Sequence, residues 1–249
     1  MWDEADSVGG RMRKLGRKLE NIGTGMESRA SHPIRKEKNP LVTQRSAEAV
    51  LSLSARLREQ TAPLHREIEV VLGLPGAIRT RDDYQDWLAR FLGLYDPLER
   101  LLATFSEWDQ LGLSMSSRDH TGCLVGDIVA LGIDPRLQPR APPALLPDLP
   151  TFAHVLGALY VIEGATLGGR LILRDLEPRL GASIAGATRF FGGRGEAVGP
   201  MWQSFRAALD EFGFLQPELC IDVVTGAERA FSAMRVWFSP FCAGKVGLP

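Results

Sequence analysis

Hydrophobic positions recur at helical spacing along most of the chain from about residue 48. From Leu57, apolar or small residues follow at offsets of 4, 7, 8, 11 and 15, which places them on one face of a helix over residues 48–72. Pro63 lies inside this stretch, so the helix is expected either to kink there or to restart with Thr61 as its cap. Alternating strand patterns are nearly absent. The pattern therefore predicts an all-α protein.

The later helices have recognisable start signals. Thr80 is a good N-cap, and acidic residues follow it in the first turn of the expected helix. Residues 134–150 hold six prolines and are expected to form a loop. The remaining helices are expected over residues 81–105, 121–131, 151–176, 200–213 and 217–238.

Composition divides the chain into a polar start and one folded domain. The first 47 residues are basic and poor in large apolar side chains, so we expect a disordered or loosely docked extension. Residues 48–240 form the expected helical domain, and 241–249 a C-terminal tail. The net charge of −1 gives no global drive toward nucleic acid or an anionic membrane.

The expected location is the cytoplasm. The three cysteines are far apart and form no C-x-x-C motif, which argues against a disulfide framework or a cysteine zinc site. No apolar run approaches the roughly 18–20 residues of a membrane span. The start of the chain lacks the apolar segment of a signal peptide.

Histidines are scarce, and one of the four is a candidate metal ligand. His65 lies on the apolar face of its helix, where it is either a core histidine or a neutral imidazole that offers a nitrogen to a metal. Arg58 lies two turns before it, roughly 10 Å away, which suits a flat anionic ligand such as haem or else a solvated side chain. His120 is expected to cap a helix or lie on the surface, His154 to be packed or exposed, and His32 to be inert.

Glycines interrupt the expected helix over residues 151–176. Gly157, Gly164, Gly168 and Gly169 each cost about 1 kcal/mol relative to alanine in a helix interior. Their presence indicates close approach of the backbone, either to another helix or to a large flat ligand. The cluster Gly192-Gly193-Arg194-Gly195 lacks the strand that a nucleotide site needs, so a turn is expected there.

Three blocks of sequence resemble bacterial biliverdin-producing haem oxygenases of the kind found with bacteriophytochromes. The blocks are Leu57–His65, Leu159–Gly169, and Phe190-Phe191-Gly192 with the later Met201–Phe205, Ala230-Phe231 and Trp237-Phe238. The resemblance covers residues 53–239. It implies a single-domain, all-α, haem oxygenase-like bundle with haem between a proximal and a distal helix.

The same resemblance implies the site. His65 would be the proximal iron ligand, and Gly164, Thr166 and Gly168 would line the distal side where oxygen binds. The cofactor-binding residues would also include Arg58, Tyr160, Gly169 and Arg206. The implied reaction converts haem and O2 into biliverdin, CO and ferrous iron. Electrons would come from an external donor such as ferredoxin or a reductase, and a bacteriophytochrome would be a candidate recipient of biliverdin.

Two positions depart from the related sequences. Residue 165 is alanine where serine is common, which removes a side-chain proton relay and leaves ordered water, held by Thr166 or backbone, to replace it. Arg194 stands where tyrosine is common, which would alter the propionate side. Two other functions stay open: a haem carrier or sensor with the same pocket, and a non-haem protein that binds a small metabolite or two irons through Glu69 or Glu163.

Overall fold

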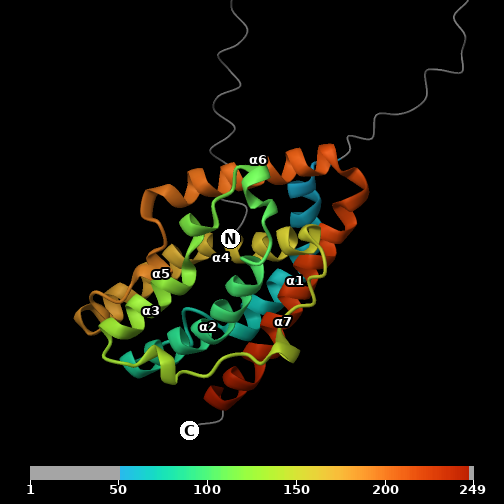
Figure 1. Cartoon of the computed structure of the whole chain (residues 1–249). Coiled ribbons are helices and arrows are strands. Elements are labelled where there is room, and N and C mark those ends of the chain that lie inside the picture. The colour runs from blue at the N-terminus through green and yellow to red at the C-terminus, as the bar shows by residue number, and fades with distance from the viewer. Residues whose placement is uncertain (1–50, 247–249) are drawn as a thin grey trace, which may run out of the picture. The chain divides into compact units, whose positions relative to one another are not determined.

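The fold of the described chain is entirely helical. The computed structural model describes residues 51–246, and every regular element in that range is a helix (Figure 1). The all-α prediction is confirmed. The predicted extension over residues 1–47 and His32 lie outside the described residues.

The first helix, α1 (Leu53–Leu72), is continuous through Pro63. Ser52 caps its start by accepting a hydrogen bond from the Ala55 N–H, and Gly73 ends it in a left-handed conformation at φ 60°. Of the two alternatives for Pro63, the restart at Thr61 is therefore wrong. Thr61 is buried inside the helix, and its hydroxyl donates to the Leu57 carbonyl at 2.7 Å instead of capping a new helix start.

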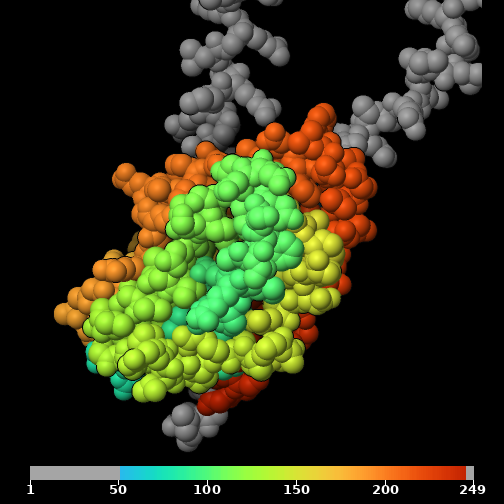
Figure 2. Space-filling model, viewed as in Figure 1, coloured from blue at the N-terminus to red at the C-terminus, as the bar shows by residue number. Residues whose placement is uncertain are grey.

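The next helix, α2 (Arg81–Leu102), begins as predicted. The Thr80 side chain accepts from the Asp83 N–H, and Asp83 accepts in return from the Thr80 N–H, which completes a capping box. After it come the short helix α3 (His120–Ala130) and the proline-rich segment, in which only the 3₁₀ turns η4 (Pro135–Leu137) and η5 (Pro143–Leu145) form. The predicted loop over 134–150 therefore contains no α-helix. In Figure 2 the chain between α2 and α4, coloured green to yellow, covers much of the viewed face.

The centre of the fold is α4 (Phe152–Leu180). Every residue from Ala153 to Gly164 is buried, because this half of the helix is apolar on most sides, with His154 and Glu163 as the exceptions. It packs most extensively against the last helix, α7 (Cys220–Val246). That helix continues beyond residue 240, where we expected the domain to end.

Glycine lets α4 and α7 approach at backbone distance. A Cβ atom built on Gly157 would lie 1.8 Å from the Val223 carbonyl oxygen, and one built on Gly226 would lie 2.0 Å from the His154 carbonyl oxygen. Each helix therefore supplies one glycine at the crossing. Packing against another helix, one of the two alternatives left open for the glycines, accounts for Gly157.

The remaining helices hold α1 and α4 in place. A short α5 (Arg189–Gly192) precedes α6 (Val198–Leu215). Both α1 and α4 pack on α6 and α7 far more than on each other. The buried Asp127 of α3 fixes α5, since it accepts hydrogen bonds from the N–H groups of Arg189 at 2.9 Å and Phe190 at 2.8 Å.

One stretch of the described chain, Phe152–Ile184, is long and apolar enough to cross a membrane by composition. It coincides with α4 and the turn η6 (Gly181–Ile184) that follows it. Within its most apolar window 61% of the residues are buried inside the fold, so core packing accounts for that composition.

Candidate functional site

His65 lies on α1 in a setting that suits a metal ligand. Its side chain is 23% exposed, and its ring packs edge-on against Phe231 of α7 with centroids 6.1 Å apart. Burial lowers the pKa of His65, and the opposing effect of the Glu69 carboxylate does not outweigh it. The imidazole is therefore neutral at neutral pH. Glu69 Oε2 lies 3.5 Å from Nδ1, which favours the tautomer protonated at Nδ1 with Nε2 as the basic nitrogen.

A second group of predicted residues gathers around Tyr160. This side chain is 1% exposed, is hydrogen-bonded to Thr61 of α1, and feels the positive charges of Arg58 and Arg206. Burial raises the pKa of Tyr160, so its phenol stays protonated. Three helices thus bring two guanidinium groups to one hydroxyl group. Such donors suit carboxylates.

The two groups are neighbours on α1. Thr61, which bonds Tyr160, precedes His65 by one helical turn, so both side chains lie on the same face of α1. The structure therefore places a neutral imidazole next to a cluster that can bind anions. A haem has a central iron and carboxylates at one edge, and this donor set fits both.

The glycines of the distal block have different surroundings. Gly164 is buried and Gly168 is half-buried on α4. A Cβ atom on Gly169 would lie 2.7 Å from the Phe191 carbonyl oxygen, so close packing against α5 explains that glycine without a ligand. The Thr166 hydroxyl donates to the Glu163 carbonyl at 2.6 Å, and the side chain of Ala165 is exposed.

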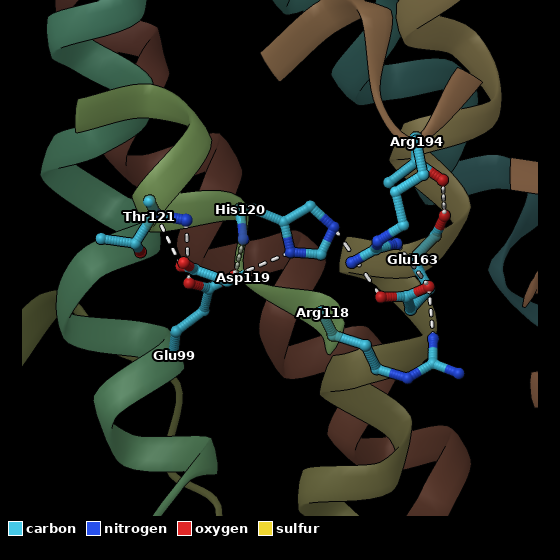
Figure 3. Close-up of polar contacts among 9 residues, drawn as sticks. Glu99, Arg118, Asp119, His120, Thr121, Glu163 and Arg194 are labelled. Atoms are coloured by element: carbon cyan, nitrogen blue, oxygen red, sulfur yellow. Dashed lines mark hydrogen bonds and ion pairs between the residues drawn. The ribbon is translucent and has the colours of Figure 1, made fainter. Parts of the chain in front are cut away.

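A buried charged network on α4 was missed by the sequence analysis. Glu163 is 1% exposed, and its Oε2 lies 2.5 Å from Arg118 of the 3₁₀ turn η3 (Met115–Arg118) and 3.6 Å from Arg194 (Figure 3). The network continues through His120 to Glu99 of α2. One signal could have indicated it, namely a single glutamate within an apolar, buried helical run.

One expectation about this region is corrected. His120 is not a surface residue: it is 7% exposed, and its Nδ1 lies 2.7 Å from Glu99 Oε1. Its partner is distant in sequence, so local spacing did not reveal it. Arg194, the departure expected to alter the propionate side, has its guanidinium 3.6 Å from Glu163. His154, expected to be packed or exposed, is packed, with Nδ1 2.7 Å from the Thr151 hydroxyl.

The two-iron alternative finds no ligand cluster. Among residues 51–246, no group of three or more His, Cys, Asp or Glu side chains is placed to hold a metal ion. Glu69 faces His65, and Glu163 faces two arginines. Neither glutamate has the further carboxylates that a two-iron site needs.

Comparison with known proteins agrees with this fold. Residues 150–240 match the sequence profile of the family described as Heme oxygenase. The crystal structure of the NO- and CO-bound heme oxygenase from Neisseria meningitidis superposes with a TM-score of 0.61 at 18% identity, covering 80% of this chain and 94% of that one. A comparison with curated protein sequences finds no match. The chain thus has the all-helical haem oxygenase fold, and its α4–α7 half carries that family's sequence signature.

Proposed function

We propose that the protein is a haem oxygenase, which cleaves haem with O2 and external electrons to biliverdin, CO and ferrous iron. The observation that carries the proposal is the convergence of Arg58 and Arg206 on Tyr160, whose hydrogen-bond partner Thr61 lies one turn of α1 before the neutral His65. Within a haem oxygenase fold, these residues form a complementary set for a metal and its carboxylates. The family signature in residues 150–240 supports the same assignment.

The residues of this chain would bind and orient the haem. His65 would ligate the iron through a nitrogen that Glu69 helps to make basic, and Arg58, Arg206 and Tyr160 would hold the carboxylates. When bound, haem itself supplies the oxygen chemistry. Gly164 and Gly168 would line the distal side with backbone instead of side chains.

The electron donor and the fate of the product belong to the same proposal. A ferredoxin or a reductase would supply electrons, and a bacteriophytochrome would receive biliverdin. We place these reactions in the cytoplasm, since none of the three cysteines is in a disulfide among the described residues and a reducing compartment fits them.

A haemin titration followed by ascorbate under air tests the proposal. We expect a one-to-one complex with a Soret band that bleaches while a broad red bilin band grows. A Soret band that persists under these conditions would refute the oxygenase and favour the carrier. If no haem spectrum forms at all, both haem functions are wrong.

The ligand assignment has its own variant and control. In His65→Ala the normal haem spectrum should be lost, and added imidazole should partly restore it, because imidazole can replace the missing side chain. His154→Ala is the matched control: it removes a buried histidine of α4 that bonds Thr151, away from the proposed ligands. If His65→Ala binds and degrades haem like the wild type, the assignment of His65 is wrong.

A further inference from the structure

Two buried hydroxyl groups join α1 to α4. Thr61 of α1 is 2% exposed, Tyr160 of α4 is 1% exposed, and their side chains are hydrogen-bonded to each other. Both helices pack on α6 and α7 far more than on each other, so this bond connects the two helices that would flank the haem. The direction of the bond decides what the phenol of Tyr160 can offer to a ligand.

The proton of the Thr61 hydroxyl is already in use. Thr61 Oγ1 lies 2.7 Å from the Leu57 carbonyl oxygen and donates to it. A carbonyl oxygen only accepts, and two acceptor oxygens do not approach to this distance without a proton between them. Because a threonine hydroxyl has a single proton, Thr61 Oγ1 can only accept from Tyr160. Tyr160 therefore donates its phenol proton to Thr61.

The charged neighbours of Tyr160 cannot take this proton. The positive charges that act on the phenol belong to Arg58 and Arg206, and a guanidinium group only donates. A carboxylate held by these arginines is different, since a charged acceptor makes a stronger hydrogen bond than a neutral hydroxyl. The phenol proton thus has two alternative acceptors, one within the protein and one on a ligand.

We propose that Thr61 competes with the carboxylates of haem for the phenol proton of Tyr160 and thereby lowers the affinity of the site. The inference rests on the proposed function. Without a ligand, Tyr160 donates to Thr61; in the complex it donates to a carboxylate, while Thr61 keeps its bond to Leu57. One hydrogen bond replaces another, so binding gains only their difference. Biliverdin retains both carboxylates of haem, so the same exchange favours its release. Thr61 is a positioning residue that acts through Tyr160.

Equilibrium binding to a valine variant tests the competition. Thr61→Val keeps the shape of the side chain but removes the acceptor, so the bond from Tyr160 to a carboxylate is no longer offset. We expect the Kd of haem, and that of biliverdin, to fall by about 2–10-fold, the change that corresponds to one net hydrogen bond. Thr61→Ser keeps the hydroxyl and should restore the wild-type Kd. A Kd of Thr61→Val at or above the wild-type value would overturn the proposal.

Two further variants show whether the effect acts through Tyr160. Tyr160→Phe removes the disputed proton, so it should weaken haem binding, and adding Thr61→Val to it should change the Kd no further. Thr104→Val is the matched control, because Thr104 also donates to a carbonyl at 2.7 Å but is exposed beyond the end of α2. It should leave the Kd unchanged. If Thr61→Val tightens binding equally in the Tyr160→Phe background, the competition is refuted.

The haem-free protein gives an independent readout. The chain has three tyrosines, and a ¹³C label at Cζ reports the hydrogen bonding of each phenol. The signal lost in Tyr160→Phe belongs to Tyr160. It should move in Thr61→Val and stay in place in Thr61→Ser, whereas Tyr84, which donates to the Ala187 carbonyl at 2.6 Å, should not respond. A Tyr160 signal that Thr61→Val leaves unmoved would refute the bond on which the competition depends.

Stability separates competition from a purely structural role. Thr61→Val loses the buried hydrogen bonds to Leu57 and Tyr160, so the haem-free variant should melt below the wild type although it binds haem more tightly. A loss of packing alone would weaken both folding and binding. If Thr61→Val does not fold, Thr61→Cys replaces it, because a thiol is only a weak acceptor. Its Kd should lie below that of Thr61→Ser, and an equal or higher Kd would refute the competition.

The wild type separates this inference from the proposed function. If it binds haem without degrading it, the oxygenase fails, while the Kd values of the variants still decide the competition. If it binds no haem, both proposals are wrong. If it degrades haem and Thr61→Val has an unchanged Kd, only the competition is refuted.

Discussion

The backbone contact between α4 and α7 can be tested by adding one methyl group, in the substitution Gly157→Ala. In Gly157→Ala the new Cβ would lie 1.8 Å from the Val223 carbonyl oxygen, about half the 3.4 Å of an ordinary contact. The position of the Cβ atom is fixed by the backbone, and the carbonyl oxygen is part of the backbone. No side-chain rotation can therefore relieve the clash, and the helices must separate. Overpacking of a core costs typically 1–3 kcal/mol, and we expect about 3 kcal/mol here. For a domain of this size, that lowers the Tm by about 6–12 °C.

The assay is thermal unfolding followed by circular dichroism, with a control on the same helix pair. Gly244 lies near the end of α7, and a Cβ there would meet nothing within 4 Å. Gly244→Ala should therefore not lower the Tm, and removal of the glycine's helix penalty of about 1 kcal/mol would raise it by about 2–4 °C. Gly226→Ala, which would place its Cβ 2.0 Å from the His154 carbonyl oxygen, should lower the Tm like Gly157→Ala. If Gly157→Ala melts within about 2 °C of Gly244→Ala, the helices are not in backbone contact and the reasoning fails.

Two further predictions concern the polar groups that fix the helices. Asp127→Ala removes the buried acceptor of the Arg189 and Phe190 N–H groups. The free energy of unfolding in urea should therefore fall by about 2–3 kcal/mol. A fall of less than about 1 kcal/mol would mean that water replaces the carboxylate. Glu99→Gln should cost about 1.5–3 kcal/mol at pH 7, because hydrogen bonds to a charged acceptor are lost. The folded-state pKa of Glu99 is depressed below 4.5, so its stabilisation is fully present above that pH and is lost as the pH falls through the folded value. The unfolding free energies of wild type and Glu99→Gln should therefore converge as the pH falls below 4.5, and a gap that stays constant would contradict the assignment.

Local sequence predicted the helices well because their signals are local. The Thr80 cap, the proline-rich loop and the apolar spacing of α1 each act over a few residues, and the structure confirms them. At Pro63 the sequence left a kink or a restart open, and the restart is wrong, since packing of the α1 face outweighs one missing hydrogen bond. Helix ends also shifted: the predicted 151–176 became Phe152–Leu180.

Some residues of the site were likewise predicted from the sequence, and others were not. Arg58, Tyr160 and Arg206 were predicted from resemblance to a family and do lie together. The Glu99–His120–Glu163 chain was not predicted, because it joins three separate helices and each member alone is unremarkable in its local pattern. The sequence also grouped Gly157 and Gly169 with the distal glycines. Their contacts in the structure show that Gly157 packs against α7 and Gly169 against α5, and local sequence does not reveal such contacts.

The two polar clusters on α4 differ in charge balance, which bears on where an anionic ligand would bind. Around Glu163 two guanidinium groups face one carboxylate, and Glu99 supplies a second carboxylate beyond His120, so that network is neutralised internally. Around Tyr160 the charges that act on the phenol are the guanidinium groups of Arg58 and Arg206. A ligand with two carboxylates therefore gains most on the Tyr160 side, where Thr61, the partner of Tyr160, lies one turn of α1 before His65. The Glu163 side, where two guanidinium groups and two carboxylates balance, has no net positive charge to offer such a ligand.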